Sequence, residues 1–155
     1  MDRLGAWLVI ACLTFGCGAA VTTAVPDEGA PPPPLEVVLR SNRIVFNRPI
    51  LFAHDSDQIL DESFEVLDRV AAIMGQHPSL IRLQVQGHSS IDGSTSHNQD
   101  LSARRAAAVA AYLREAGVAQ EITSQGYGET YPLCHEDTDD CHARNRRVEF
   151  FVDER

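Results

Sequence analysis

Positive charge is scarce in this chain, and so are long apolar runs. Its 155 residues include 13 Lys and Arg against 22 Asp and Glu, which gives a formal net charge of −9. That balance argues against a nucleic-acid partner and against a basic patch for an anionic membrane surface. The apolar run from Leu4 to Gly16 is shorter than the roughly 20 residues that a membrane-spanning helix needs.

The motifs of several common enzyme classes are also missing. The chain has no Gly-x-Ser-x-Gly elbow, no P-loop and no His-Glu-x-x-His helix. The segment from His88 to Asp92 contains the residue types of a catalytic triad. These residues crowd into one short loop, where a nucleophile, a base and an orienting acid rarely reach the required geometry. We therefore predict that the protein is not an enzyme and needs no cofactor.

The N-terminus predicts export. Arg3 is followed by an apolar run and then by small residues, which is typical of a signal peptide. Cys17 stands where a bacterial lipoprotein signal places its acylated cysteine, just before a flexible tether. We therefore predict a lipoprotein-type signal peptide over residues 1–17 and a lipid on Cys17. Gly18 differs from the Asp that retains such proteins in the inner membrane of enteric bacteria, which favours the outer membrane.

Two other processing sites remain open. Residues 9–12, Val-Ile-Ala-Cys, fit the pattern before a lipidated cysteine better than the residues before Cys17 do, which favours Cys12. That choice leaves an apolar segment of about five residues, below the usual ~7. Ordinary cleavage near Ala20 or Ala24 is the third possibility.

Cys134 and Cys141 form a second pair, within L-C-H-E-D-T-D-D-C-H, whose acidic, turn-forming composition predicts a loop. Export into an oxidising compartment predicts a disulfide between them. The alternative is a zinc site, because His135 and His142 follow the two cysteines and complete four candidate ligands. We favour the disulfide, which would stiffen the loop leading into Asn145, and predict no metal.

The rest of the chain divides into a linker and one domain. Residues 18–36 include Pro26 and the run Pro31 to Pro34, which predicts a semi-rigid linker of about 3 Å per residue. Residues 37–155 then alternate between strand and helix signals without an internal repeat.

Strand patterns lie at Arg43 to Phe52, interrupted by Pro49, and at Leu80 to Gln86, Ile122 to Gln125 and Arg147 to Val152. A first helix is expected from a cap at Asp61 to the stop at His77-Pro78. A longer helix runs through Arg105 to a cap at Gly117.

Alternation along the strands predicts which residues face the core: Ile81, Leu83, Val85, Val148, Phe150 and Val152. The expected fold is α+β. It is a βαβαββ two-layer sandwich, in which two main helices cover one face of a mixed sheet.

The long helix places a charge on an apolar stripe. Steps of three and four residues align Leu101, Arg105, Ala108, Val109, Tyr112 and Ala116 on one face. Arg104 points about 100° away and can reach water. A guanidinium cannot lose its proton, so Arg105 must meet a carboxylate of the protein or of a ligand. The stripe therefore predicts a binding site.

Five segments of the chain form an ordered set of motifs: F-A-H-D-S-D-Q-I at 52–59, Q-G-H at 86–88, N-x-x-L-S-x-R-R-A-x-x-V-x-x-Y-L at 98–113, G-Y-G-E-T-Y-P at 126–132 and N-R-R-V-E-F at 145–150. Together they resemble the OmpA-like C-terminal domain of peptidoglycan-associated lipoproteins. The resemblance covers roughly residues 40–155. It implies the fold expected above and non-covalent binding of the peptide stem of peptidoglycan, commonly through the carboxylate and amine of diaminopimelate.

The resemblance also implies a two-part clamp, of which one part is altered here. The family's arginine is matched by Arg105, which suits bidentate recognition of a carboxylate. The family's aspartate, in a G-H-T-D motif, is replaced by Ser90, although the spacing to Arg105 is unchanged. Ser90 can accept a hydrogen bond from an ammonium group but cannot neutralise it, which would cost about 1 to 3 kcal/mol.

Asp92 offers a replacement for the missing acid. It lies two residues on, in a loop that Gly93 makes adaptable, and could place its carboxylate in the same pocket. Two structural roles compete with this one: pairing with Arg105 or capping the following turn.

Three further residues match family positions at or near the ligand. The resemblance puts Asp55 at the rim of the pocket, Asn98 beside the ligand and Arg146 near it, while Ala53 replaces a frequent family Asp. Asn98 can also cap the first turn of its helix, and Arg146 can be a plain surface charge. His88 is expected to be a packed or hydrogen-bonded structural residue.

Together these features predict an outer-membrane lipoprotein whose periplasmic domain tethers the membrane to the cell wall. Its partners would be peptidoglycan with a diaminopimelate-type stem peptide, the membrane through the lipid anchor, and possible envelope proteins. The alternative is a domain of the same fold with a degenerate clamp, which acts as an envelope scaffold or protein-interaction element.

Overall fold

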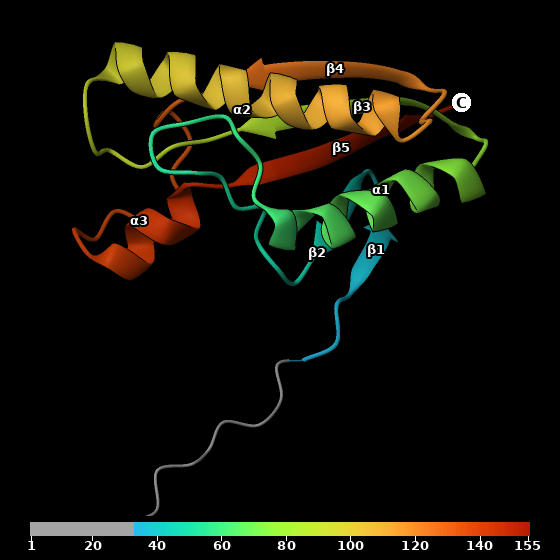
Figure 1. The fold of residues 1–155 in the computed structure, drawn as a ribbon, viewed down its shortest axis with the longest axis horizontal. Helices are drawn as coiled ribbons and strands as arrows, with labels where there is room; N and C mark the ends of the chain where they lie inside the picture. Colours follow the sequence, from blue (N-terminus) through green and yellow to red (C-terminus); the bar gives the residue numbers. More distant parts are fainter. Residues whose placement is uncertain (1–32) are drawn as a thin grey trace, which may run out of the picture. The chain divides into compact units, whose positions relative to one another are not determined.

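A mixed five-stranded sheet and two long helices make up the part of the chain that the structure describes, residues 33–155 (Figure 1). The structure is a computed structural model. The predicted signal peptide, Cys17 and most of the predicted linker lie outside the described residues. By their contacts, Pro34–Arg155 form one unit.

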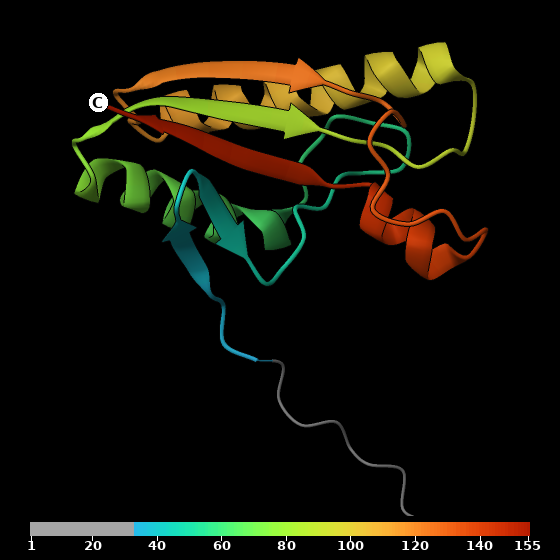
Figure 2. The ribbon, with the colours of Figure 1, turned by 180° about the vertical axis from the view of Figure 1, so that it is seen from behind.

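The elements follow one another as β1 (Val37–Arg40), β2 (Arg43–Phe46), the 3₁₀ turn η1 (Asp61–Ser63), α1 (Phe64–Gln76), β3 (Leu80–Gly87), α2 (Thr95–Glu115), β4 (Glu121–Gly126), α3 (Asp139–Asn145) and β5 (Val148–Glu154). The strand order is β1-β2-β5-β3-β4, in which only the β3–β4 pair is parallel. Figure 2 shows the sheet in front of α1 and α2, which cover its other face. The predicted α+β class and two-layer arrangement are confirmed.

The first predicted strand is a short hairpin followed by irregular chain. β1 pairs with β2, which ends at Phe46, so the strand pattern over 43–52 is broken before Pro49, as its proline indicated. Proline has no N–H to donate to a ladder, which explains why pairing does not continue. Further along, Phe52 forms only an isolated bridge with Ile59.

The predicted cap at Asp61 is wrong. Asp61 begins η1, and α1 starts three residues later, with Ser63 in the cap position. The Ser63 hydroxyl accepts a hydrogen bond from the Leu51 N–H at 2.7 Å and caps no helix N–H. α1 ends at Gln76, before His77-Pro78, as predicted.

One inward position on β3 was also predicted wrongly. The β3–β5 register shifts between Leu80 and Arg82. Leu80 therefore faces the core at 3% exposure, while Ile81 is 42% exposed. Leu83 and Val85 are fully buried, as predicted.

α2 packs directly on the ends of two strands because glycines stand beneath it. A Cβ on Gly87 would lie 2.2 Å from the Ser102 carbonyl oxygen, and one on Gly126 would lie 2.4 Å from the Ala103 nitrogen. No side chain fits at such distances, so the helix backbone contacts the sheet at this end.

The buried face of α2 is shifted from the predicted stripe. Its buried residues are Asn98, Leu101, Ser102, Ala106, Val109, Ala110 and Leu113. Arg105, Ala108 and Tyr112 are half-buried, and Ala116 is exposed. Arg105 therefore lies on the margin of the buried face, where one side of its guanidinium can reach a pocket. The helix ends before Gly117, whose φ of +90° suits glycine.

The acidic segment predicted as a loop contains the helix α3. Thr138 caps it by accepting from the Cys141 N–H at 3.3 Å, and Asp139 and Asp140 in its first turn suit the positive end of the helix. Within residues 33–155, no helix combines the length and the apolar character needed to cross a membrane.

Candidate functional site

One pocket of about 510 Å³ contains all six residues predicted for ligand binding. They come from the chain before η1, the β3–α2 loop, α2 and the end of α3: Asp55, Ser90, Asp92, Asn98, Arg105 and Arg146. The pocket is also lined by residues that were not predicted to bind the ligand, including Phe52, Ser89, His97 and Leu101.

Arg105 is held by the backbone of the loop that follows β2. Its Nε donates to the Ser56 carbonyl at 2.8 Å, and its Nη2 lies 3.5 Å from the Ala53 carbonyl. The guanidinium also lies over the Phe52 ring, 5.0 Å from the ring centre, which is a favourable cation–π distance. These contacts fix the guanidinium without neutralising it.

The charge of Arg105 has no ion-pair partner among residues 33–155. Burial lowers the pKa of this guanidinium, and the charge of Asp55 opposes that shift. The arginine nevertheless stays protonated at any ordinary pH. The sequence required a carboxylate for this group, and within the described chain none of the protein's own carboxylates fills that role.

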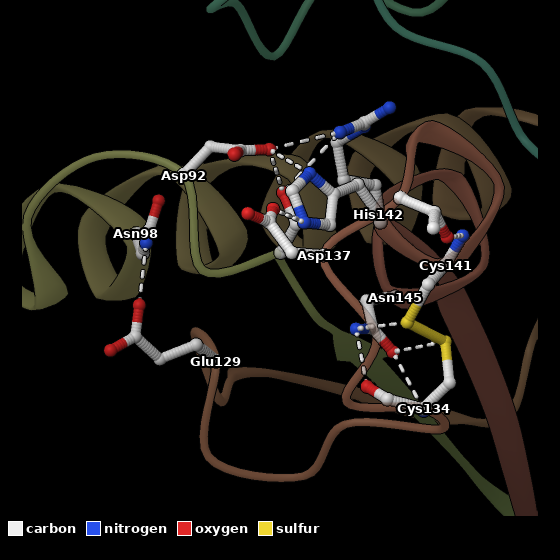
Figure 3. Close-up of polar contacts among 11 residues, drawn as sticks. Asp92, Asn98, Glu129, Cys134, Asp137, Cys141, His142 and Asn145 are labelled. Carbon is white, nitrogen blue, oxygen red and sulfur yellow. Dashed lines mark hydrogen bonds and ion pairs between the residues drawn. A yellow bond between two sulfur atoms is a disulfide. The ribbon is translucent and has the colours of Figure 1, made fainter.

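Asp92 gathers its contacts on one oxygen. Its Oδ2 accepts from the Ser90 hydroxyl at 2.8 Å, and it lies 3.3 Å from Arg146 Nη1 and 3.1 Å from His142 Nδ1. Figure 3 shows these contacts meeting at a single Asp92 oxygen. Over residues 33–155, no protein group is bonded to Oδ1. The possible pairing of Asp92 with Arg105 is wrong, because Arg146 and His142 take that place.

Ser90 forms hydrogen bonds with both Asp92 and Arg146. Its side chain is 3% exposed, and its Oγ lies 2.8 Å from Asp92 Oδ2 and 3.3 Å from Arg146 Nη1. The hydroxyl therefore donates to the carboxylate and accepts from the guanidinium. Arg146 is 44% exposed but is not a plain surface charge, since it lines the pocket and contacts both residues.

One prediction made Asn98 a cap of α2, and that prediction is wrong. Ser94 is the cap and accepts from the His97 N–H at 3.2 Å, whereas Asn98 lies within the helix and is 3% exposed. Its Nδ2 donates to Glu129 Oε2 at 2.7 Å. A carboxylate only accepts, so the amide nitrogen must face Glu129 and the amide oxygen points away from it (Figure 3).

His97 and Asp55 close one rim of the pocket. His97 Nε2 lies 2.6 Å from Asp55 Oδ1, and both side chains are about half exposed. Asp55 has φ of +48°, a left-handed conformation that Asp tolerates better than most residues. The His97 contact joins residues 42 positions apart, so sequence patterns gave no signal for it.

His88 is a packed residue, as predicted, but not a hydrogen-bonded one. It is 4% exposed and stacks on Tyr127 with ring centres 5.5 Å apart. Neither ring nitrogen has a hydrogen-bond partner in the described chain. Burial, assisted by the charge of Arg147, lowers its pKa to about 4. No serine–histidine pair is formed in this loop, since Ser90 bonds to Asp92 instead.

Cys134 and Cys141 are joined by a disulfide. They approach Glu136 in a group that could otherwise hold a metal, but bonded sulfurs are not thiolate ligands. The remaining candidate zinc ligand on α3, His142, faces Asp92 rather than the cysteines. The arrangement therefore does not fit the alternative zinc site.

The fold and the pocket define a class: a two-layer α+β domain with a pocket that is lined by both guanidinium and carboxylate groups. Residues 51–146 match the OmpA family, and the chain belongs to it.

Two curated relatives and two solved structures illustrate the similarity. The chain is 37% identical over 105 residues to the peptidoglycan-binding protein ArfA of Mycobacterium tuberculosis, covering 67% of this chain and 32% of the relative. It is 35% identical over 108 residues to the peptidoglycan-associated lipoprotein of Legionella pneumophila, covering 69% and 61%. The chain thus spans less than two thirds of the length of these curated relatives.

Among solved structures, the cell wall anchor of the T6SS from Pseudomonas aeruginosa shares 30% identity and a TM-score of 0.64, covering 78% of this chain and 88% of that one. The peptidoglycan-associated lipoprotein from Burkholderia pseudomallei shares 25% identity and a TM-score of 0.62, covering 69% and 91%.

Proposed function

We propose that this domain binds peptidoglycan non-covalently through the diaminopimelate of the peptide stem, and so tethers an envelope membrane to the cell wall. Support comes from relatives that are named for peptidoglycan binding or association. The pocket adds chemical support, because it offers a cation and an anion to a ligand that carries an amine and a carboxylate.

Arg105 is the observation that carries the proposal. Its guanidinium is half-buried, is fixed by two backbone carbonyls and has no ion-pair partner in residues 33–155. A ligand carboxylate that replaces water at this guanidinium gains a charge-assisted hydrogen bond without first displacing an internal ion pair. The site is therefore preorganised for an anionic group.

The ammonium of the ligand would be accepted by Asp92 and Asn98. Asp92 has one oxygen without a protein partner, and Asn98 turns its amide oxygen away from Glu129. Both residues line the same pocket as Arg105. We therefore favour a rearranged clamp, in which Asp92 takes the role that the family gives to the position of Ser90.

A scaffold that has lost ligand binding is the second candidate. Ser90 favours it, because its hydroxyl already serves Asp92 and Arg146 and carries no charge of its own. The contacts of Asp92 weigh against it, since they place a carboxylate beside the substituted position.

Co-sedimentation of the complete chain with purified sacculi tests the proposal. We expect the protein to pellet with sacculi at low salt and to be released by a soluble stem peptide that contains diaminopimelate. Release should fail with a peptide in which the free diaminopimelate carboxyl is amidated, because Arg105 then loses its partner. Protein that stays in the supernatant would favour the scaffold.

The membrane anchor is a separate part of the proposal. We propose that Cys17 carries a lipid and that the domain lies in the periplasm, attached to the outer membrane. Cys17→Ser should abolish labelling by a palmitate analogue and release the protein into the soluble periplasmic fraction. Labelling that persists in Cys17→Ser but disappears in Cys12→Ser would assign the lipid to Cys12.

A further inference from the structure

The carboxylate of Asp92 is held in place from α3, a helix that belongs to a different part of the chain. His142 and Arg146 lie four residues apart at the C-terminal end of this segment and therefore point to the same side. Both reach Asp92 Oδ2, His142 through Nδ1 at 3.1 Å and Arg146 through Nη1 at 3.3 Å. Of the two, His142 is the better shielded, with 12% of its side chain exposed against 44% for Arg146.

The disulfide fixes the position from which His142 reaches Asp92. Cys141, directly before His142, is 1% exposed and is bonded to Cys134. Asn145 ties the same segment down, accepting from the Leu133 N–H at 2.8 Å and donating to the Cys134 carbonyl at 3.0 Å. Figure 3 shows Asn145 beside the two sulfur atoms, with His142 on the Asp92 side of α3. A rotation of α3 is therefore opposed on both sides of His142.

Both ring nitrogens of His142 lie near carboxylates. Nδ1 is 3.1 Å from Asp92 Oδ2, which favours a proton on this nitrogen because an ionised carboxylate has no hydrogen to donate. Nε2 lies 3.2 Å from Asp137 Oδ1, but it has no hydrogen-bond partner in the described chain and the Asp137 side chain is 91% exposed. Water screens the charge of Asp137, so the contact with Asp92 is the stronger of the two.

We propose that His142 is a positioning residue for ligand binding, and that the Cys134–Cys141 disulfide makes it one. Oδ2 accepts hydrogen bonds from Ser90 and Arg146 and also lies 3.1 Å from His142 Nδ1, so these groups restrain the carboxylate and leave Oδ1 for the ammonium of the stem peptide. This inference rests on the proposed function. It adds that ligand affinity depends on His142 and on an oxidised α3 segment, neither of which needs to touch the ligand.

Calorimetry with the complete chain and a soluble diaminopimelate stem peptide tests the role of His142. His142→Ala should weaken binding about three- to tenfold, the effect of one lost polar contact that orients the carboxylate. His142→Asn should restore most of the affinity, because its amide can donate from nearly the position of Nδ1. His135→Ala is the matched control, an exposed histidine beside the other cysteine, and should bind like the wild type.

A double-mutant cycle separates positioning from a general structural effect. In an Asp92→Asn background, His142→Ala should cause little further loss, because the carboxylate that it orients is gone. A full-sized loss in that background, or wild-type affinity in His142→Ala, would overturn the inference. A wild-type chain that binds no stem peptide would instead remove the proposed function itself.

Reduction of the disulfide provides the second test. The Cys134→Ser/Cys141→Ser variant should lose the same three- to tenfold in affinity as His142→Ala, and adding His142→Ala to it should change little. The nitrogen-15 shift of His142 Nδ1 reports the contact without ligand. It should move on Asp92→Asn and on reduction, but not on His135→Ala. Unchanged affinity after reduction would remove the disulfide from the inference.

Discussion

The two charged sides of the pocket are built in different ways. The Arg105 side, formed by Arg105 with Phe52, Ala53 and Ser56, holds its charge with backbone carbonyls and a ring face. The Asp92 side, formed by Asp92 with Ser90, His142 and Arg146, holds its charge with side chains alone. Backbone acceptors persist through most substitutions, whereas side-chain donors can be exchanged.

The difference suggests why the acid rather than the arginine departs from the family pattern here. A carboxylate held by exchangeable donors can move from position 90 to position 92 if neighbouring donors move with it. The guanidinium has no such freedom, because its acceptors follow the path of one loop.

Loss of Arg105 should have the largest effect. Arg105→Ala leaves the ligand carboxylate unpaired and should weaken stem-peptide binding by about 3 kcal/mol, or roughly a hundredfold. The measurement is calorimetry, with circular dichroism to check that the helices remain. Arg104→Ala is the matched control, since Arg104 pairs with Asp100 and Asp57 outside the pocket. Equal losses in the two variants would mean that overall charge, not the site, binds the ligand.

Acid should lower the stability of the whole domain, because His88 is buried in its neutral form. The folded state keeps His88 neutral with a pKa of about 4, while an unfolded chain protonates histidine near pH 6.5. The unfolded state therefore gains protons first as the pH falls from 6.5 towards 4, and stability is lost across that window. The expected loss is about 2 kcal/mol between pH 7.5 and pH 5.

Thermal unfolding at several pH values measures this effect. His88→Phe keeps a ring against Tyr127 and removes the titrating group, so its stability should change much less between pH 7.5 and pH 5. A wild type whose melting temperature is flat over that range would mean that His88 is protonated in the fold.

Neutralising Asp92 should have a smaller effect than removing Arg105. Asp92→Asn keeps the shape of the side chain but removes the charge that would face the ligand ammonium, so binding should weaken by about 1 to 2 kcal/mol. Calorimetry with the same stem peptide is the measurement. If this variant binds as tightly as the wild type, the acid has not moved to position 92, and the domain is a weakened binder.

Restoring the family's acid should change affinity least. In Ser90→Asp, a second carboxylate would stand about where the Ser90 hydroxyl lies, 2.8 Å from Asp92 Oδ2, and the two would repel. We expect a change in binding of less than about 1 kcal/mol in the natural background. In the expected case, the double variant Ser90→Asp/Asp92→Asn should recover the affinity that Asp92→Asn alone loses. A gain larger than about 1 kcal/mol in Ser90→Asp would instead show that the pocket lacks its anion.

Sequence periodicity was enough to find the fold and the Arg105 side. The helix period placed Arg105 within an apolar stripe, whereas the structure puts it at the edge of the buried face. Strand alternation correctly found Leu83, Val85 and Phe150 in the core. Ile81 was misplaced because a register shift depends on the pairing partner, β5, and not on the strand's own pattern.

The Asp92 side could be predicted from the sequence only in part. Its carboxylate could be proposed from position, but two of the residues that contact it, His142 and Arg146, lie in and directly after a helix that was expected to be a loop. α3 has seven residues, too few for an apolar stripe, and its buried face holds Cys141 and Asn145. Thr138 followed by two aspartates was a usable signal for its start. No local signal could bring His142 to a residue 50 positions away.

Gly87 and Gly126 help to set the distance between the two charged sides of the pocket. Because α2 rests on bare backbone at these two positions, the height of its first half above the sheet is set by main-chain contact. Arg105 is carried by that half, whereas Asp92 is carried by the loop that leaves β3 just after Gly87. A single methyl group at Gly87 would push the helix away from the sheet and increase the distance between the two charges. In the proposed binding mode, two residues without side chains thus help to set the spacing between the amine and the carboxylate that the pocket accepts.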